Sequence, residues 1–272
     1  MSMPYTTPQC VTGKPCGRTC IAHEKECRRG FDSPSYQKAA RRLRATTERL
    51  LGKGSRRDYA TGSARLPNVK RSHLTDTQQR IIDAVILWTN GFVPAVRDPG
   101  LFDPDEVEEI EGIVFGATRK HPEQREVYNV TPTEESYKDA RKVMTALSMA
   151  PAGKDVPDIH RGVRLKQSVI DSLEPGTEFD TGTINSFSAA ERESNRFALA
   201  TESEEDRAKI PVVFHIDWAD VKRGTNIKGI STHYREEEFV TGGRARVLSK
   251  AYERINHDGG VFHVWNVHLE QV

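Results

Sequence analysis

Cysteine is scarce in this chain of 272 residues, and all four cysteines fall within the first 27 positions. A secreted protein of this size more often carries disulfides in its main domain, so the pattern favours a reducing, cytoplasmic location. The sequence has no run approaching the ~18 consecutive apolar residues of a membrane-spanning helix, and its start lacks the apolar segment of a secretory signal. It also lacks the G-x-G-x-x-G loop of dinucleotide-binding βαβ units. We therefore expect a cytoplasmic protein with no membrane partner and no Rossmann-type domain.

The four cysteines, Cys10, Cys16, Cys20 and Cys27, define a small N-terminal module over residues 1–30. They are separated by five, three and six residues, without the paired C-x2-C knuckles that mark many zinc sites. Three states stay open from the sequence: a zinc-held module, a disulfide-held module, or free thiols. Zinc is thus a possible cofactor of this module.

Charge is unevenly distributed, although the net formal charge is only +1. Residues 1–73 hold 16 Lys and Arg against 5 Asp and Glu, so the rest of the chain is net acidic. Within 31–73 we expect a basic helix over 33–52, capped by Ser33, and then a flexible linker. The basic stretch 38–72 is compatible with phosphate contacts to nucleic acid, or with a solvated arm or docking segment.

Residues 74–150 have the apolar periodicity of helices. Thr75 and Gln78 form a capping box, Asp103 opens a second, acidic helix, and Thr131 with Glu134 caps a third. The expected buried face of this third helix is Tyr137, Ala140, Val143, Met144 and Leu147.

From 151 to 272 the chain changes to short apolar runs separated by glycine-containing turns. The expected strands are 159–165, 183–188, 210–217, 238–240, 244–249 and 261–269. A helical block followed by a strand block predicts an α+β fold with mostly antiparallel strands.

Arg161 is conspicuous because strand alternation places it on the same face as Ile159, Val163 and Leu165. A guanidinium among aliphatic side chains needs an anion, which is either a bound phosphate or carboxylate or a structural acid. Gly162 beside it leaves room for a ligand to approach the backbone.

Two further strands carry polar residues at alternating positions. Ser186 and Ser188 share one face of the expected strand 183–188, where hydroxyls can hold a carboxylate or a ribose. Glu236 and Glu238 lie on one side of the next motif, about 7 Å apart. Such a pair can divide acid and base roles or stabilise positive charge, or it can be an acidic strand edge that prevents aggregation.

In this order, IHRGVRL, NSFSAAE and REEEFVTGGRARVLS resemble the Arg / Ser-x-Ser / Glu-x-Glu signature of mono-ADP-ribosyltransferases, the arginine-directed enzymes of bacterial toxins, phages and animal cell surfaces. His160 stands where the family usually has an aromatic residue, and Phe187 where it usually has threonine. The resemblance covers about residues 74–272. It implies a helical lobe (74–150) packed on a split two-sheet, mostly antiparallel NAD-binding core (151–272).

The resemblance also implies roles for the motif residues. Arg161 would grip the NAD phosphates, Ser186 would position Glu238 and brace the nicotinamide ribose, and Glu238 would stabilise the positive charge that develops there. Glu236 would orient and deprotonate an acceptor arginine. Gly162, Ser188 and Phe197 are further candidates for NAD contact, Phe197 by stacking on nicotinamide, although Phe197 is also a candidate core residue.

The function that the resemblance implies is transfer of ADP-ribose from NAD to an acceptor protein, on arginine, with release of nicotinamide. The alternatives are an NAD glycohydrolase and a non-catalytic binding or adaptor protein with a basic N-terminal arm. A protein of this kind acts in its own cytoplasm, is packaged in a virion, or is delivered into a host cell.

Overall fold

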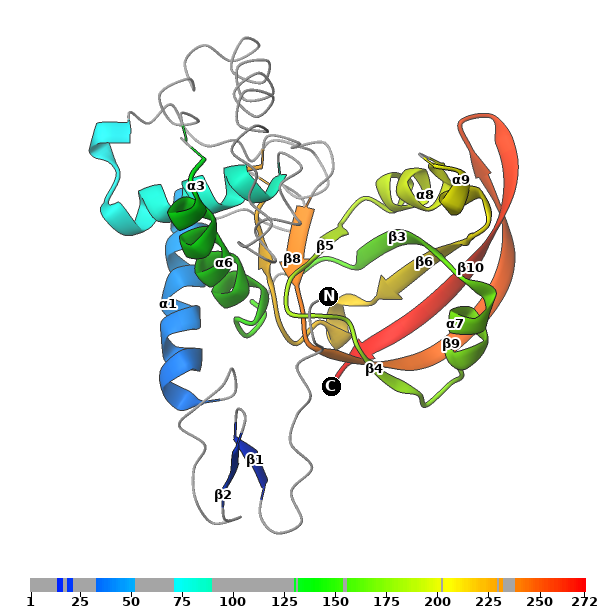
Figure 1. The fold of residues 1–272 in the computed structure, drawn as a ribbon, viewed down its shortest axis with the longest axis horizontal. Helices are drawn as coiled ribbons and strands as arrows, with labels where there is room; N and C mark the ends of the chain where they lie inside the picture. The colour runs from blue at the N-terminus through cyan, green and yellow to red at the C-terminus, as the bar shows by residue number, and fades with distance from the viewer. Residues whose placement is uncertain are drawn as a thin grey trace.

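The computed structural model describes residues 14–16, 19–21, 33–51, 71–89, 130, 132–153, 156–201, 203–228, 230–231 and 238–272. Helices gather on one side of the molecule and a long, curved sheet on the other (Figure 1). The described helices of the helical side are α1 (Pro34–Leu51), α3 (Asp76–Thr89) and α6 (Glu134–Ser148), with the 3-10 turn η1 (Arg71–His73). None of the helices in these ranges is long and apolar enough to cross a membrane.

Two of the predicted helix starts are confirmed. The Ser33 hydroxyl accepts from the backbone N–H of Tyr36 at 3.3 Å, at the start of α1. In front of α3, the backbone N–H of Thr75 donates to Gln78 Oε1 at 2.8 Å, and the N–H of Gln78 donates to Thr75 Oγ1 at 3.4 Å. The capping box read from the sequence therefore forms. The expected helix at Asp103 lies outside the described residues.

The predicted cap of the third helix is wrong by two positions. Thr133, not Thr131, caps α6, and its partner in the capping box is Ser136 rather than Glu134. The helix begins at Glu134, so Glu134 lies in the first turn, where its carboxylate is favoured by the helix dipole, and the third helical position falls on Ser136. The predicted apolar face of this helix is confirmed, since all five of its residues are buried.

A first hydrophobic core joins the three helices to one end of the sheet. It contains Ile81, Val85, Tyr137, Leu147 and Val240, among others. Helix α1 contributes the buried Leu50, and Arg44 Nη1 donates to the backbone oxygen of Pro151 at 2.6 Å. Helix α1 packs on α3 and α6, and the predicted domain boundary at residue 73 stays a prediction.

Within the described ranges, eight strands form one mixed sheet in the order β4-β9-β10-β6-β3-β5-β8-β7, and a separate hairpin joins β1 to β2. Neighbours in the large sheet are antiparallel except for the parallel pair β10–β6. The strands are β1 (Lys14–Cys16), β2 (Thr19–Ile21), β3 (Ile159–Leu165), β4 (Glu178–Asp180), β5 (Asn185–Ser188), β6 (Ile210–Ile216), β7 (Thr225–Asn226), β8 (Glu238–Thr241), β9 (Arg244–His257) and β10 (Gly260–Gln271). The mixed helix and strand composition and the mostly antiparallel sheet agree with the expected α+β class.

Short helices complete the sheet side of the molecule, and a second core packs against the sheet. These helices are α7 (Gln167–Ser172), α8 (Glu191–Leu199), α9 (Glu204–Arg207) and the 3-10 turn η5 (Trp218–Asp220). The second core includes Ile159, Ile170, Phe187, Phe239 and Leu269. The two cores lie on opposite faces of β5 and β8, because Val240 belongs to the first core and its neighbour Phe239 to the second.

The joint between β3 and β5 is the narrowest in the sheet. The two strands pair at a single position, His160 with Ser188, whereas β3 and β6 pair along seven residues. Beyond that one pair β3 and β5 separate. The strand order is continuous through this joint, so the expected division into two sheets stays a prediction.

Candidate functional site

Glu238 is a buried carboxylate that begins β8. It is 6% exposed and lies opposite Ser188 in the pairing of β5 with β8. The Ser186 hydroxyl donates to Glu238 Oε1, and the Ser231 hydroxyl donates to Oε2 at 3.3 Å. Two of the three sequence motifs therefore meet in a direct hydrogen bond. An ionised carboxylate only accepts hydrogen bonds, and both of these neighbours donate.

Trp88, at the end of α3, supplies a third donor that sequence reasoning missed. Its indole Nε1 lies 2.8 Å from Glu238 Oε1 and 2.9 Å from Ser186 Oγ, so one N–H serves both acceptors. The ring is 1% exposed. A buried indole needs a partner for its N–H. That general rule was the only signal in the sequence, and it did not name the partner.

Arg161 reaches the same serine from the other side of the strand. Its Nη1 donates to Asn185 Oδ1 at 2.8 Å and to the backbone oxygen of Ser186 at 3.2 Å. These bonds lie next to the point where β3 and β5 separate, so the guanidinium joins two strands that have only one residue pair between them. Ser186 thus contacts Arg161 through its backbone and Glu238 through its side chain.

A cavity of about 320 Å³ opens beside Arg161, with a mostly apolar lining. Its polar lining includes Arg161, Asp180, Thr181 and Asn185, and its apolar lining includes Phe187. The volume lies at the lower end of the range for small-molecule sites. Asn185 and Phe187 face this cavity, so strand alternation turns the Ser186 side chain the other way. Arg161 and Glu238 therefore converge across the backbone of β5, rather than inside this cavity.

The remaining candidates for NAD contact have protein neighbours of their own. The Ser188 hydroxyl donates to the backbone oxygen of Ala190 at 3.1 Å and accepts from its N–H at 2.9 Å, which shapes the turn into α8. A Cβ at Gly162 would lie 1.8 Å from the backbone oxygen of Ser194, so the close approach at this glycine is made by α8. Phe197 is 45% exposed, with the Arg196 guanidinium 4.9 Å from its ring centre. The alternative of Phe197 as a core residue is therefore wrong.

Several predicted residues fall outside the described part of the chain. Glu236 lies in the segment 232–237, which is not described, and Cys10 and Cys27 are not described either. The backbones of Cys16 and Cys20 lie in the hairpin of β1 and β2, opposite Thr19 and Pro15. In the described ranges no group of three or more His, Cys, Asp or Glu side chains is arranged to hold a metal ion. Nothing in these ranges therefore supports the expectation of zinc.

A row of polar side chains, of which His215 and Asn266 are buried, crosses the sheet from His160, the residue before Arg161. Asn266 Nδ2 donates to Glu253 Oε2 at 2.6 Å, which leaves Asn266 Oδ1 to accept from His215 Nε2 at 2.9 Å. His215 Nδ1 must then accept from His160 Nδ1, also at 2.9 Å, if both rings are neutral. Burial, together with the neighbouring His215, lowers the pKa of His160 to about 4, and burial also lowers the pKa of His215. Both imidazoles are therefore neutral at pH 7.

The chain was compared with known families, sequences and structures. No protein-family model matches it, and no curated protein sequence matches it. Several solved structures are similar at low sequence identity. The Vis toxin, an ADP-ribosyltransferase from Vibrio splendidus, is 18% identical with a TM-score of 0.43, covering 89% of this chain and 90% of that one.

Two other similar structures come from different bacteria. Exoenzyme S from Pseudomonas aeruginosa, in complex with human 14-3-3 protein beta and bound to carba-NAD, is 14% identical with a TM-score of 0.43, covering 86% of this chain and 89% of that one. The enzymatic component C2-I of the C2 toxin from Clostridium botulinum is 12% identical with a TM-score of 0.40, covering 79% of this chain and 45% of that one. At such identities and scores, the function has to be judged from the site itself.

Proposed function

We propose that this protein is an NAD-dependent ADP-ribosyltransferase that modifies arginine on an acceptor protein. The observation that carries the proposal is the convergence on Ser186. Its backbone oxygen accepts from Arg161 and its hydroxyl donates to Glu238, although the three residues are spread over 78 positions of the chain. The order of the three motifs and these contacts suit a reaction in which a cation, Arg161, binds phosphates and an anion, Glu238, stabilises a developing positive charge.

NAD as substrate supplies the ADP-ribosyl group and a nicotinamide that is already a cationic leaving group. As the bond between nicotinamide and the ribose C1′ breaks, the electron pair leaves with nicotinamide and positive charge develops on the ribose. Glu238 stabilises this charge, as a carboxylate does in glycoside cleavage. Trp88, Ser186 and Ser231 hold the Glu238 carboxylate in one orientation, so it does not have to reorganise during the reaction.

The acceptor nitrogen then forms a bond to C1′, and its proton must leave. We assign that proton to Glu236, two residues before Glu238 in the sequence. A guanidinium is a poor nucleophile until it loses a proton, so a carboxylate base beside it accounts for the choice of arginine.

Arg161 is assigned to the pyrophosphate of NAD. Its guanidinium has five N–H donors, and Nη1 fixes it against β5 through Asn185 Oδ1 and the backbone oxygen of Ser186. The fork geometry suits two phosphate oxygens at once.

The experiment that tests the proposal combines purified protein, labelled NAD and a bacterial lysate. Wild-type protein should transfer label to protein bands, and neutral hydroxylamine should release it, as expected for a bond to arginine. Glu238→Gln should abolish both protein labelling and nicotinamide release. Glu236→Gln should abolish labelling.

The same assay separates the other two functions. If Glu236→Gln still produces free ADP-ribose, and wild-type protein labels no acceptor protein, the activity is NAD glycohydrolysis and not transfer. Absence of any NAD turnover in wild-type protein, together with no NAD binding by calorimetry, would leave a binding or adaptor role. Label that resists hydroxylamine would remove arginine as the acceptor.

A further inference from the structure

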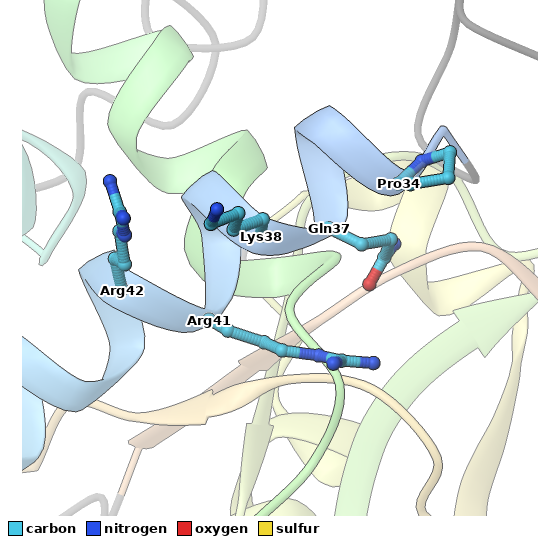
Figure 2. Close-up of a pocket in the computed structure, with 5 residues that line it drawn as sticks. All are labelled: Pro34, Gln37, Lys38, Arg41 and Arg42. Atoms are coloured by element: carbon cyan, nitrogen blue, oxygen red, sulfur yellow. The ribbon is translucent and has the colours of Figure 1, made fainter.

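One face of α1 carries a line of cations. At 100° per residue, Lys38, Arg42 and Arg49 lie within about 40° of one another around the helix axis, opposite the buried Ala40 and Thr47. Arg41 flanks this line. We call these four residues, Lys38, Arg41, Arg42 and Arg49, the basic stripe. All four are exposed, and Figure 2 shows the side chains of Arg41 and Arg42 extending away from the helix.

The cations of the basic stripe are not neutralised within the described residues. Arg49 bonds only inside its own helix, to the Ala45 oxygen at 3.1 Å and Thr46 Oγ1 at 3.3 Å. The one acid of α1, Glu48, lies at the flank and pairs with Arg44 at 3.4 Å. On the sheet side of the molecule cations commonly have acidic partners, as Arg192, Arg196, Lys209, Arg244, Arg246 and Lys250 do.

The basic stripe is held in place by the opposite face of the same helix. Ala40, Thr47 and Leu50 are buried, and the bond from Arg44 to Pro151 ties α1 to the chain that leads into the sheet. Beside the first turns, Pro34, Gln37, Lys38, Arg41 and Arg42 line a hollow of about 550 Å³ (Figure 2). The stripe therefore presents a fixed pattern of charge beside a recess.

From Lys38 to Arg49 the stripe is about 16 Å long, at 1.5 Å per residue. A nucleic-acid strand places a phosphate about every 3.4 Å along a duplex axis, so several phosphates fall within this length. Three of the four cations are arginines, whose planar fork binds phosphate through two bonds. The sequence that follows, 53–72, adds six Lys and Arg against one Asp.

The chemistry of the stripe disfavours other occupants. A protein interface usually has a central aromatic or apolar anchor, and no such side chain lies among the four stripe residues. A helix that inserts into a lipid surface needs its apolar face, and the apolar face of α1 is buried in the first core. The exposed face of α1 is thus a row of cations whose apolar neighbours are small, namely Pro34 and Ala45.

We propose that α1 is a docking surface for the phosphate backbone of nucleic acid, without sequence preference, and that the basic stripe makes the contacts. This role is separate from the proposed NAD chemistry, since none of the stripe residues belongs to the Glu238 site. Within the basic part of the chain, the proposal places the contact with nucleic acid on the exposed face of α1.

The test measures anisotropy of a fluorescein-labelled 20-base-pair DNA duplex with full-length protein, without NAD, between 50 and 200 mM salt. Lys38→Gln/Arg42→Gln/Arg49→Gln should weaken binding on the order of 100-fold at the lowest salt and reduce the slope of log K against log[salt] by about 2.7, which is 0.9 for each of three contacts. Lys38→Arg/Arg42→Lys/Arg49→Lys, which keeps the charge, should stay within a few-fold of wild type.

The control is Arg192→Gln/Arg207→Gln/Arg254→Gln, which removes three exposed cations from the sheet side and should leave the salt slope unchanged. Circular dichroism establishes that each variant is folded. Equal losses in both triple variants would reduce the effect to net charge and overturn the proposal. The proposal is also overturned if wild-type protein does not bind the duplex but binds phosphatidylserine vesicles or an acidic polypeptide at the same salt concentration.

Discussion

The sharpest test of the site is Trp88→Phe. The substitution keeps an aromatic ring in the first core but removes the one N–H that serves Glu238 and Ser186. A hydrogen bond to a charged group contributes about 1.5–3 kcal/mol, and the lost part of the indole adds about 1 kcal/mol for the space it leaves. We therefore expect the free energy of unfolding to fall by about 3 kcal/mol.

The effect on turnover is the more informative readout. Without the indole donor the Glu238 carboxylate loses one of the three hydrogen bonds that Trp88, Ser186 and Ser231 donate to it, so its orientation is less well fixed. A catalytic group displaced by about 1 Å can cost on the order of 100-fold in rate. Nicotinamide release should therefore show kcat reduced about 10- to 100-fold, while KM for NAD changes by less than about threefold, because Arg161 is untouched.

The matched control is Ile86→Ala on the same helix. Ile86 is 1% exposed and belongs to the same core, and its truncation should cost a similar 2–5 kcal/mol without touching the hydrogen bonds of Glu238. At a temperature where both variants are folded, this control should keep near-wild-type kcat. Equal loss of kcat in both variants, or wild-type kcat in Trp88→Phe, would refute the positioning role of the indole.

Three further outcomes follow from the same geometry. The pKa of His160 is about 4 in the folded protein, below its ordinary value of 6.5, so the unfolded chain binds more protons between these two pH values. The free energy of unfolding should therefore be at its full value above pH 6.5 and fall by about 3 kcal/mol as the pH drops to 4. Urea titrations of His160→Phe should show a smaller fall over the same pH range. Gly162→Ala should destabilise the protein by about 3 kcal/mol or more in the same assay, because its Cβ would meet the α8 backbone at 1.8 Å and 2.5 Å. Arg161→Lys should weaken NAD binding at least tenfold, as measured by calorimetry. An ammonium lacks the planar guanidinium fork that can bond Asn185 and Ser186 and also bind the proposed phosphate. Unchanged affinity would show that Arg161 does not belong to the NAD site.

Regular hydrophobic patterns made most elements predictable from the sequence. The periodicity of α1 and α6 and the alternation in β3 reflect burial of one face, and the continuous apolar runs in α3 and β6 reflect burial on more than one side, so the bounds of these elements follow closely from the residues. The described elements that were missed are six residues long or shorter, too short for a period to register; they are β1, β2, β4, β7, α7, α9, η1 and η5. The far half of β9 was also missed, because residues 251–254 are exposed and mix apolar and charged side chains without alternation.

Site residues were predictable where they lie on strands in motifs whose order along the chain resembles that of a known family. Ser186 and Glu238 could be paired as neighbours through the resemblance of their motifs. Trp88 could not, because its partners lie 98 and 150 positions away and no local pattern encodes the approach of α3 to β8. The contacts of Arg161 are likewise tertiary, and one of them is to a backbone oxygen, which has no sequence signature.

These contacts make the site a junction between the two cores. The Trp88 ring packs in the first core, while Phe187 and Phe239, next to Ser186 and Glu238 in the chain, pack in the second. The position of the carboxylate is therefore set by packing on both faces of β5 and β8, and by Arg161 where β3 and β5 separate. Among the described side chains of α3, the Trp88 indole is the one bonded to Glu238, so a substitution of Trp88 itself should displace the carboxylate, whereas truncation of other core residues of this helix should leave its hydrogen bonds in place.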